Sequence, residues 1–244
     1  MMKKKITYII GIYTLIQFII LLCFGYTPYP DSQGYINCAQ ASLNYGQYYP
    51  AKEELYTLPF LWNIGAINMV AFSLKYFDSI VPILLFYTIL KSGIILLIYL
   101  IALKWFNKHI AYLAIIIAVF YPANYGEATS LLSEIPFVFC ILFGIYACLY
   151  KKYLAGGILF GFADYFRPIA IIFILAYIIS NIKNYKAYFK LCITYSIVIC
   201  CIGFSNYISK GQFIYKAKTG WMALAQYHWD NDPSKKGVEP MRVT

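Results

Sequence analysis

Charged side chains are scarce in this chain of 244 residues, where aspartate, glutamate, lysine and arginine together make up only 12%. An average soluble domain carries about 25% charged residues and about 45–50% apolar ones. Here hydrophobic residues reach 61%, and the mean hydropathy is +0.64. The composition excludes an ordinary soluble domain and predicts an all-α fold, a polytopic integral membrane helix bundle.

Patterns that bind metals or nucleotides, or that form disulfide frameworks, are also lacking. The two histidines, His109 and His228, are isolated, and of the seven cysteines only Cys38 falls in an expected loop. Cysteines within apolar runs behave as small hydrophobic residues. Without CxxC or Cys/His spacing, and without a glycine-rich phosphate loop, we predict no metal and no cofactor.

The net charge of +10 would indicate a nucleic-acid partner in a soluble protein. In this chain the lysines cluster between apolar runs, where they orient membrane helices and meet anionic headgroups. Membrane lipids, and no nucleic acid, are therefore the expected partners.

Five apolar runs predict membrane spans, at residues 6–26, 81–103, 110–125, 134–150 and 188–207. Lysines at positions 3–5 precede the first run and predict a retained first helix whose N-terminus lies inside the cell. The whole chain, 1–244, is then a single transmembrane domain.

Two polar segments are expected on the outside. Residues 27–58 form the first outside loop, in which residues 34–45 predict a short helix on the membrane surface. The next segment, 58–74, is broken by Pro59 and polar residues and predicts an interfacial or re-entrant helix. Residues 209–244 form a C-terminal loop, so we expect the sequence to be the N-terminal part of a longer protein.

Residues 154–180 allow two structures. One long helix would hold Arg167 at its middle, at a cost of about 2.5–3.5 kcal/mol on insertion scales. A hairpin would put Arg167 at an outer turn, but each arm would be shorter than the roughly 20 residues of a full crossing. The distribution of lysines favours the single helix. The residues alone leave both open.

The carboxylates of Asp31, Glu127 and Glu134 fall on the expected outer side. A partly desolvated carboxylate has a raised pKa and suits a general base. The structural alternatives are a helix N-cap for Asp31 and a favourable first-turn acid for Glu134.

Arg167 suits bidentate phosphate binding, and its alternative is an ion pair with Asp164 one turn earlier. The spacing of Gly157 and Gly161 predicts close helix packing.

Several motifs together resemble the GT-C glycosyltransferases, in particular the protein O-mannosyltransferases and the aminoarabinose transferases of lipid A. The matching positions are Asp31-x-x-x-Tyr35-x-x-x-Ala39 followed by Gly46, Tyr121-Pro122, residues 133–137, residues 157–168 ending in Arg167-Pro168, Asn206-Tyr207, Gly211, Thr219-Gly220 and residues 233–237. The chain departs from relatives with paired acids in the first loop, because Ser32 follows Asp31. The family also continues through further spans.

The resemblance implies a membrane enzyme that moves a sugar from a polyprenyl-phosphate donor to an acceptor hydroxyl, with inversion. The acceptor would be a glycan, a lipid or a protein, and the reaction would occur on the outer face of a bacterial cytoplasmic membrane. Asp31 would be the catalytic base and Arg167 would hold the lipid phosphate. Glu134, Glu127 and Tyr35 would bind substrate. The family topology favours the hairpin.

Two other functions remain open. A transporter or flippase for a lipid-linked or anionic solute would line its path with Arg167 and Asp164 at the middle of one long helix. A non-catalytic membrane subunit would use all its acids as helix caps.

Overall fold

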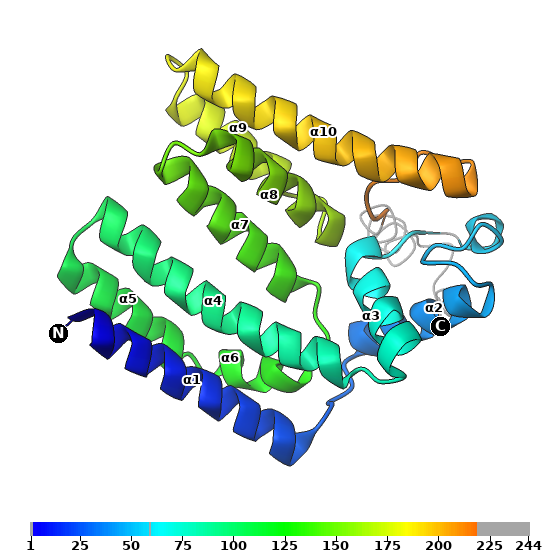
Figure 1. Ribbon diagram of the computed structural model, residues 1–244, viewed down its shortest axis with the longest axis horizontal. Coiled ribbons are helices and arrows are strands. Elements are labelled where there is room, and N and C mark those ends of the chain that lie inside the picture. The colour runs from blue at the N-terminus through cyan, green and yellow to red at the C-terminus, as the bar shows by residue number, and fades with distance from the viewer. Residues whose placement is uncertain (1, 59, 219–244) are drawn as a thin grey trace, which may run out of the picture.

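All regular structure in residues 2–58 and 60–218, the part that the computed structural model describes, is helical (Figure 1). The α-helices are α1 (Met2–Phe24), α2 (Pro30–Asn44), α3 (Ile64–Phe77), α4 (Val81–Trp105), α5 (Lys108–Phe120), α6 (Ala123–Gly126), α7 (Glu134–Leu149), α8 (Tyr153–Phe166), α9 (Ile171–Ser180) and α10 (Tyr185–Lys210). Two 3-10 turns accompany them, η1 (Glu54–Tyr56) and η2 (Glu127–Thr129). The matches at Thr219, Gly220 and 233–237 lie outside the described residues, as does most of the expected C-terminal loop.

Three of these helices are long and apolar enough to cross a membrane: Lys5–Phe24, Val81–Trp105 and Tyr185–Lys210. They agree with three of the expected spans, and by length and composition they indicate a membrane protein. The expected spans at 110–125 and 134–150 correspond to shorter apolar helices, α5 and α7, and α3 is also short. Helix α3 covers residues 64–77 and overlaps the expected segment 58–74; its interfacial or re-entrant position stays a prediction.

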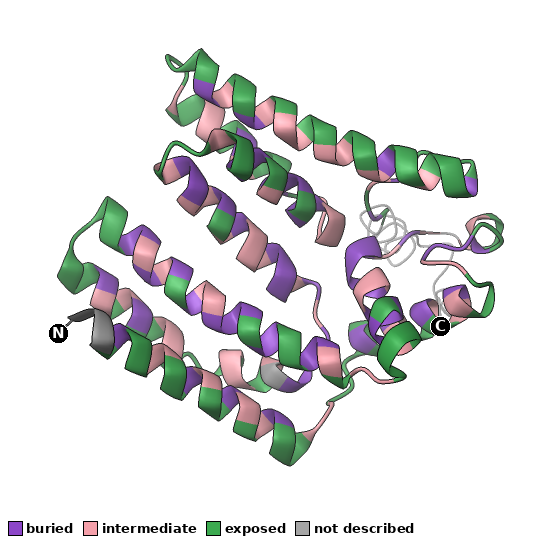
Figure 2. Ribbon diagram, in the orientation of Figure 1, coloured by how far each residue is buried: buried purple, intermediate pink, exposed green. Residues whose placement is uncertain are grey.

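The helices form one stack in which α4 and α7 run in one direction, while α1, α5, α8 and α10 run in the opposite one (Figure 1). Helix α4 packs against α1, α5 and α7, and α8 packs between α7 and α10. Burial is concentrated on α4, α7 and α3, while α1 and α10 leave much of their apolar surface exposed (Figure 2). Apolar side chains exposed on the outermost helices suit contact with lipid tails.

The segment 154–180 is a hairpin. Helix α8 ends at Phe166, Arg167 has an extended backbone, and α9 begins at Ile171. The rings of Tyr153 and Tyr177 lie 6.0 Å apart, and those of Phe160 and Phe173 lie 6.5 Å apart. Because residues near the start of the segment contact residues near its end, the segment consists of two antiparallel helices and not of one long helix.

Asp164 holds the turn of this hairpin. Its Oδ1 accepts a hydrogen bond from the backbone N–H of Ala170 at 2.6 Å, and its Oδ2 accepts one from the hydroxyl of Tyr195 at 2.5 Å. The carboxylate therefore ties the end of α8 to the start of α9 and to α10.

Close packing of α8 on α10 depends on the two predicted glycines. A Cβ on Gly157 would overlap Thr194 and Leu191, and one on Gly161 would lie 2.7 Å from the Cβ of Val198. The packing expectation is confirmed, because the backbones approach where only hydrogen occupies the side-chain position.

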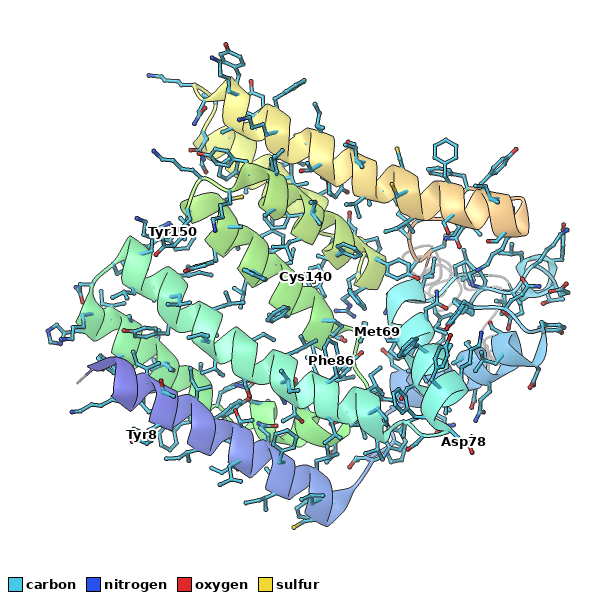
Figure 3. All side chains as sticks on the ribbon, in the orientation of Figure 1. Tyr8, Met69, Asp78, Phe86, Cys140 and Tyr150 are labelled. Carbon is cyan, nitrogen blue, oxygen red and sulfur yellow. The ribbon has the colours of Figure 1, made fainter. Side chains whose placement is uncertain are left out.

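The stack has two chemically different ends. The lysine end comprises the turns between α4 and α5, α7 and α8, and α9 and α10, with Lys104, Lys108, Lys151, Lys152, Lys183 and Lys186. The opposite loop end carries α2, α3 and every acidic residue of the described part of the chain. Figure 3 shows Tyr150 at the lysine end and Asp78 at the loop end.

Candidate functional site

Arg167 and Glu134 form an ion pair at the loop end, with 3.0 Å between Nη2 and Oε1. Arg167 follows the last residue of α8, and Glu134 is the first residue of α7. The side chains are 36% and 41% exposed, so both reach solvent. The alternative pair of Arg167 with Asp164 is wrong, since the Asp164 carboxylate is engaged within the hairpin. The first-turn position expected for Glu134 is confirmed.

A hydrogen-bonded network connects Glu134 to α2 and α3. The Tyr35 hydroxyl donates to Ser133 Oγ at 3.3 Å, and Ser133 Oγ donates to Glu134 Oε2 at 3.2 Å. The amide of Asn63 donates to the Tyr35 hydroxyl at 2.8 Å and to Ser133 Oγ at 3.0 Å. Three elements far apart in sequence therefore meet at Glu134.

Tyr35 is buried within this network. Burial raises the pKa of its hydroxyl, and the hydrogen bonds oppose that rise. The negative charges of Asp31 and Glu134 raise the same pKa further, so both carboxylates lie within electrostatic reach of the hydroxyl. Tyr35 stays protonated at neutral pH and acts as a hydrogen-bond donor.

Asp31 is exposed in the first turn of α2, one helical turn before Tyr35. The N-cap position of this helix is Tyr29, so the N-cap interpretation of Asp31 is wrong. The helix also begins at Pro30, four residues earlier than the expected start. An exposed carboxylate beside an organised network is free to contact a ligand.

Ser32, the residue after Asp31, anchors α2. Its side chain is buried, and its hydroxyl donates to the carbonyl of Leu131 at 2.8 Å. This bond fixes α2 to the segment before α7, and a buried carboxylate there would meet a carbonyl oxygen instead of a donor.

Glu127 lies apart from the Arg167 pair but shares a cavity with Glu134. The cavity has a volume of about 170 Å³ and lies between α1, α4, α7 and the η2 turn. Its lining includes Tyr13, Lys91 and Asn124. The structure therefore connects Tyr35, Glu134 and Arg167 through direct contacts and Ser133, with Asp31 one helical turn before Tyr35 and Glu127 across this cavity.

Lys91 is a polar residue of this site that the sequence reasoning missed. Its side chain is only 4% exposed, its Nζ donates to the carbonyl of Asn124, and Glu127 Oε2 lies 3.9 Å away. The available signal was a single lysine inside the apolar run 81–103. An ionisable residue in such a run is rare and usually functional.

Two further cavities meet beside the hairpin turn at Asn68 and Tyr165, whose side chains share a hydrogen bond of 2.7 Å. The first is an apolar groove of about 520 Å³ between α3 and α4, with Met69 and Phe86 in its lining (Figure 3). The second is polar, about 440 Å³, and includes Lys210. Together they offer adjoining apolar and polar surfaces.

Within the described residues, histidine, cysteine and acidic side chains form no group of three or more that could hold a metal ion. Comparisons with known protein families, with curated proteins and with solved structures find no match to this chain. The function must therefore be argued from the polar cluster at the loop end.

Proposed function

We propose that this chain is a membrane glycosyltransferase of the GT-C type, which moves a sugar from a polyprenyl-phosphate donor to an acceptor hydroxyl. The helix stack would span a bacterial cytoplasmic membrane as a polytopic bundle. The lysine end would face the cytoplasm, in keeping with the distribution of basic residues in membrane proteins. The loop end, with its acids, would face outward.

One observation carries the proposal: the guanidinium of Arg167 pairs with Glu134 at the loop end, and hydrogen bonds through Ser133 connect Glu134 to Tyr35, one helical turn from the exposed carboxylate of Asp31. Transfer from a lipid phosphate needs a cation at the leaving group and a base at the acceptor. The cation Arg167 and the carboxylates of Asp31 and Glu134 are half-exposed or exposed at the loop end, where a helix stack of this composition would meet the membrane surface.

In the proposed reaction, the Asp31 carboxylate takes the proton of the acceptor hydroxyl. The acceptor oxygen attacks the anomeric carbon from the side opposite the phosphate, so the configuration inverts. The bond between that carbon and the phosphate oxygen breaks, and its electron pair leaves on the lipid phosphate. Arg167 stabilises this charge, since its fork of N–H groups matches phosphate oxygens.

The remaining residues of the cluster would position the substrates. Glu134 orients Arg167 through the 3.0 Å ion pair and offers an oxygen to an acceptor. Tyr35 donates its hydroxyl hydrogen to Ser133 and so holds α2, with Asp31, against the start of α7. Glu127 binds substrate from across the small cavity. The groove with Met69 and Phe86 would take the start of the polyprenyl chain.

The competing transporter function placed Arg167 and Asp164 at the middle of one long helix. The hairpin removes that arrangement, because Arg167 follows the end of α8. A subunit whose acids only cap helices is less well supported, because Asp31 lies inside α2 and Glu134 pairs with Arg167.

The test is sugar transfer in membranes that contain the full chain, with radiolabelled polyprenyl-phosphate sugars added and transfer to endogenous acceptors measured. Asp31→Asn removes the base and should lower the rate by about 10²-fold or more. Asp78→Asn is the matched control, since Asp78 ends α3 in a left-handed conformation that asparagine tolerates. Equal activity of Asp31→Asn and wild type, with normal insertion, would refute the proposed base.

A further inference from the structure

The small cavity beside Glu134 has a buried polar floor and a charged mouth. The floor carries the ammonium group of Lys91, 4% exposed, and the ring of Tyr13, 1% exposed. At the mouth, the side chains of Glu127 and Glu134 are each 41% exposed. Aliphatic side chains such as Ile95 form the walls.

The charges around this cavity balance. Within the lining Lys91 is positive, and Glu127 and Glu134 are negative; Glu134 is paired with Arg167, which lies outside the lining, so a neutral ligand fits better than an ion. The lining offers both donors and acceptors, as a ligand with several hydroxyl groups requires. A hydrocarbon chain would remove solvent from the Lys91 ammonium without providing a hydrogen bond, which is unfavourable.

The size of the cavity limits the ligand to a single ring. A volume of about 170 Å³ corresponds to about six water molecules, at roughly 30 Å³ each. Sites for drug-sized ligands have volumes of about 300–1,000 Å³. One unsubstituted sugar ring is of about this size, whereas a disaccharide or an N-acetylated sugar would have to leave part of its atoms outside the mouth.

We infer that this cavity binds the sugar ring of the donor, a neutral pentose or hexose, and that Lys91 determines the specificity by donating a hydrogen bond to a ring hydroxyl. The inference rests on the proposed function, which puts the donor phosphate at Arg167. Glu134 contacts Arg167 on one side and lines the cavity on the other. A sugar attached to a phosphate at Arg167 therefore enters the cavity past Glu134.

The experiment compares lipid affinities of the purified full-length chain by native mass spectrometry. The probes are polyprenyl phosphate without a sugar, the same lipid carrying a neutral pentose or hexose, and the same lipid carrying N-acetylglucosamine. The variants are Lys91→Met, which keeps most of the side-chain length but removes the ammonium group, and Tyr13→Phe, which removes one hydroxyl. Lys91→Met leaves Glu127 half-exposed, so no carboxylate is buried without a partner.

Wild type should bind at least one pentosyl or hexosyl lipid about tenfold or more tightly than the bare lipid phosphate, the effect of one hydrogen bond to a charged group. The N-acetylated lipid should show no such gain. Lys91→Met should abolish the gain and leave affinity for bare polyprenyl phosphate unchanged, and Tyr13→Phe should reduce it.

Two kinds of failure are distinguishable. Equal affinity of wild type for the bare lipid and for every sugar-bearing lipid would overturn the sugar pocket while leaving the phosphate site intact. A sugar-dependent gain that survives in Lys91→Met would overturn the role of Lys91. If wild type binds neither bare polyprenyl phosphate nor any of the sugar-bearing lipids, the proposed function itself is contradicted.

Discussion

Replacement of Arg167 by alanine should separate stability from ligand binding. The ion pair with Glu134 is close, at 3.0 Å, but both side chains are more than one-third exposed. Ion pairs of this exposure contribute about 0–1 kcal/mol to stability, because solvent screens them. For a chain of this size, a loss of 1 kcal/mol lowers Tm by about 2–4 °C, so Arg167→Ala should melt within that range of wild type.

Binding of a lipid phosphate should respond much more strongly to the same change. A hydrogen bond to a charged group contributes about 1.5–3 kcal/mol, so losing the guanidinium should weaken binding of polyprenyl phosphate by about 10–150-fold. Arg167→Lys keeps the charge but loses the planar fork, and it should bind with intermediate affinity. The assays are thermal unfolding in detergent and a titration with polyprenyl phosphate.

A large change in Tm together with a small change in phosphate affinity would contradict the proposed role of Arg167. A large fall in Tm for Arg167→Ala, with unchanged affinity for polyprenyl phosphate, would make the residue a structural clamp on α7. The matched control is Glu134→Gln, which breaks the same ion pair but keeps the guanidinium. This variant should retain measurable phosphate binding.

Three further predictions concern the hairpin, helix packing and thiol chemistry. Asp164→Asn loses an anionic acceptor at the hairpin turn and should lower the free energy of unfolding by about 1.5–3 kcal/mol in a denaturant titration. Gly157→Ala should destabilise the chain by about 1–3 kcal/mol through overlap with α10, whereas Gly11→Ala, which has open space, should not. Burial raises the pKa of the Cys38 thiol to about 11, with a smaller contribution from a neighbouring carboxylate. At pH 8 only about one Cys38 thiol in a thousand is then ionised. Cys38 should therefore react with iodoacetamide about a hundred times more slowly than a cysteine at the exposed position of Gln40→Cys, because the thiolate is the reactive form. The reaction rate of Cys38 should rise with pH.

The long helices could be predicted from the sequence because their signal is local. Runs such as 81–103 are apolar apart from a few residues such as Lys91 and are followed by lysines, and helix α4 matches that run closely. The hairpin could not be decided in this way. The cost of inserting Arg167 favoured the hairpin, whereas the length of each arm and the distribution of lysines favoured one helix. The deciding contact, Asp164 with the N–H of Ala170, exists only once the chain has turned.

The candidate site shows the same division. Individual polar residues in apolar surroundings, Asp31, Glu134 and Arg167, could be identified from their positions along the chain. The partner of Arg167 could not, because Glu134 lies 33 positions earlier (167 minus 134) on another helix, whereas Asp164 is the near neighbour. Lys91 was missed because a single lysine does not change the prediction of a membrane span at 81–103, so it attracted no functional interpretation.

The central claim requires the turn at Arg167 and the lysine end to lie on opposite sides of the membrane. The most direct measurement is labelling of Ile169→Cys in intact cells with a membrane-impermeant maleimide, on a background from which the native cysteines have been removed. Ile169 is exposed in the hairpin turn, and Lys183→Cys is the matched control at the lysine end. Labelling at position 169 in intact cells, and at position 183 only after permeabilisation, is the predicted result. Protection of position 169 until the cells are permeabilised would contradict the phosphate role of Arg167 on the outer face.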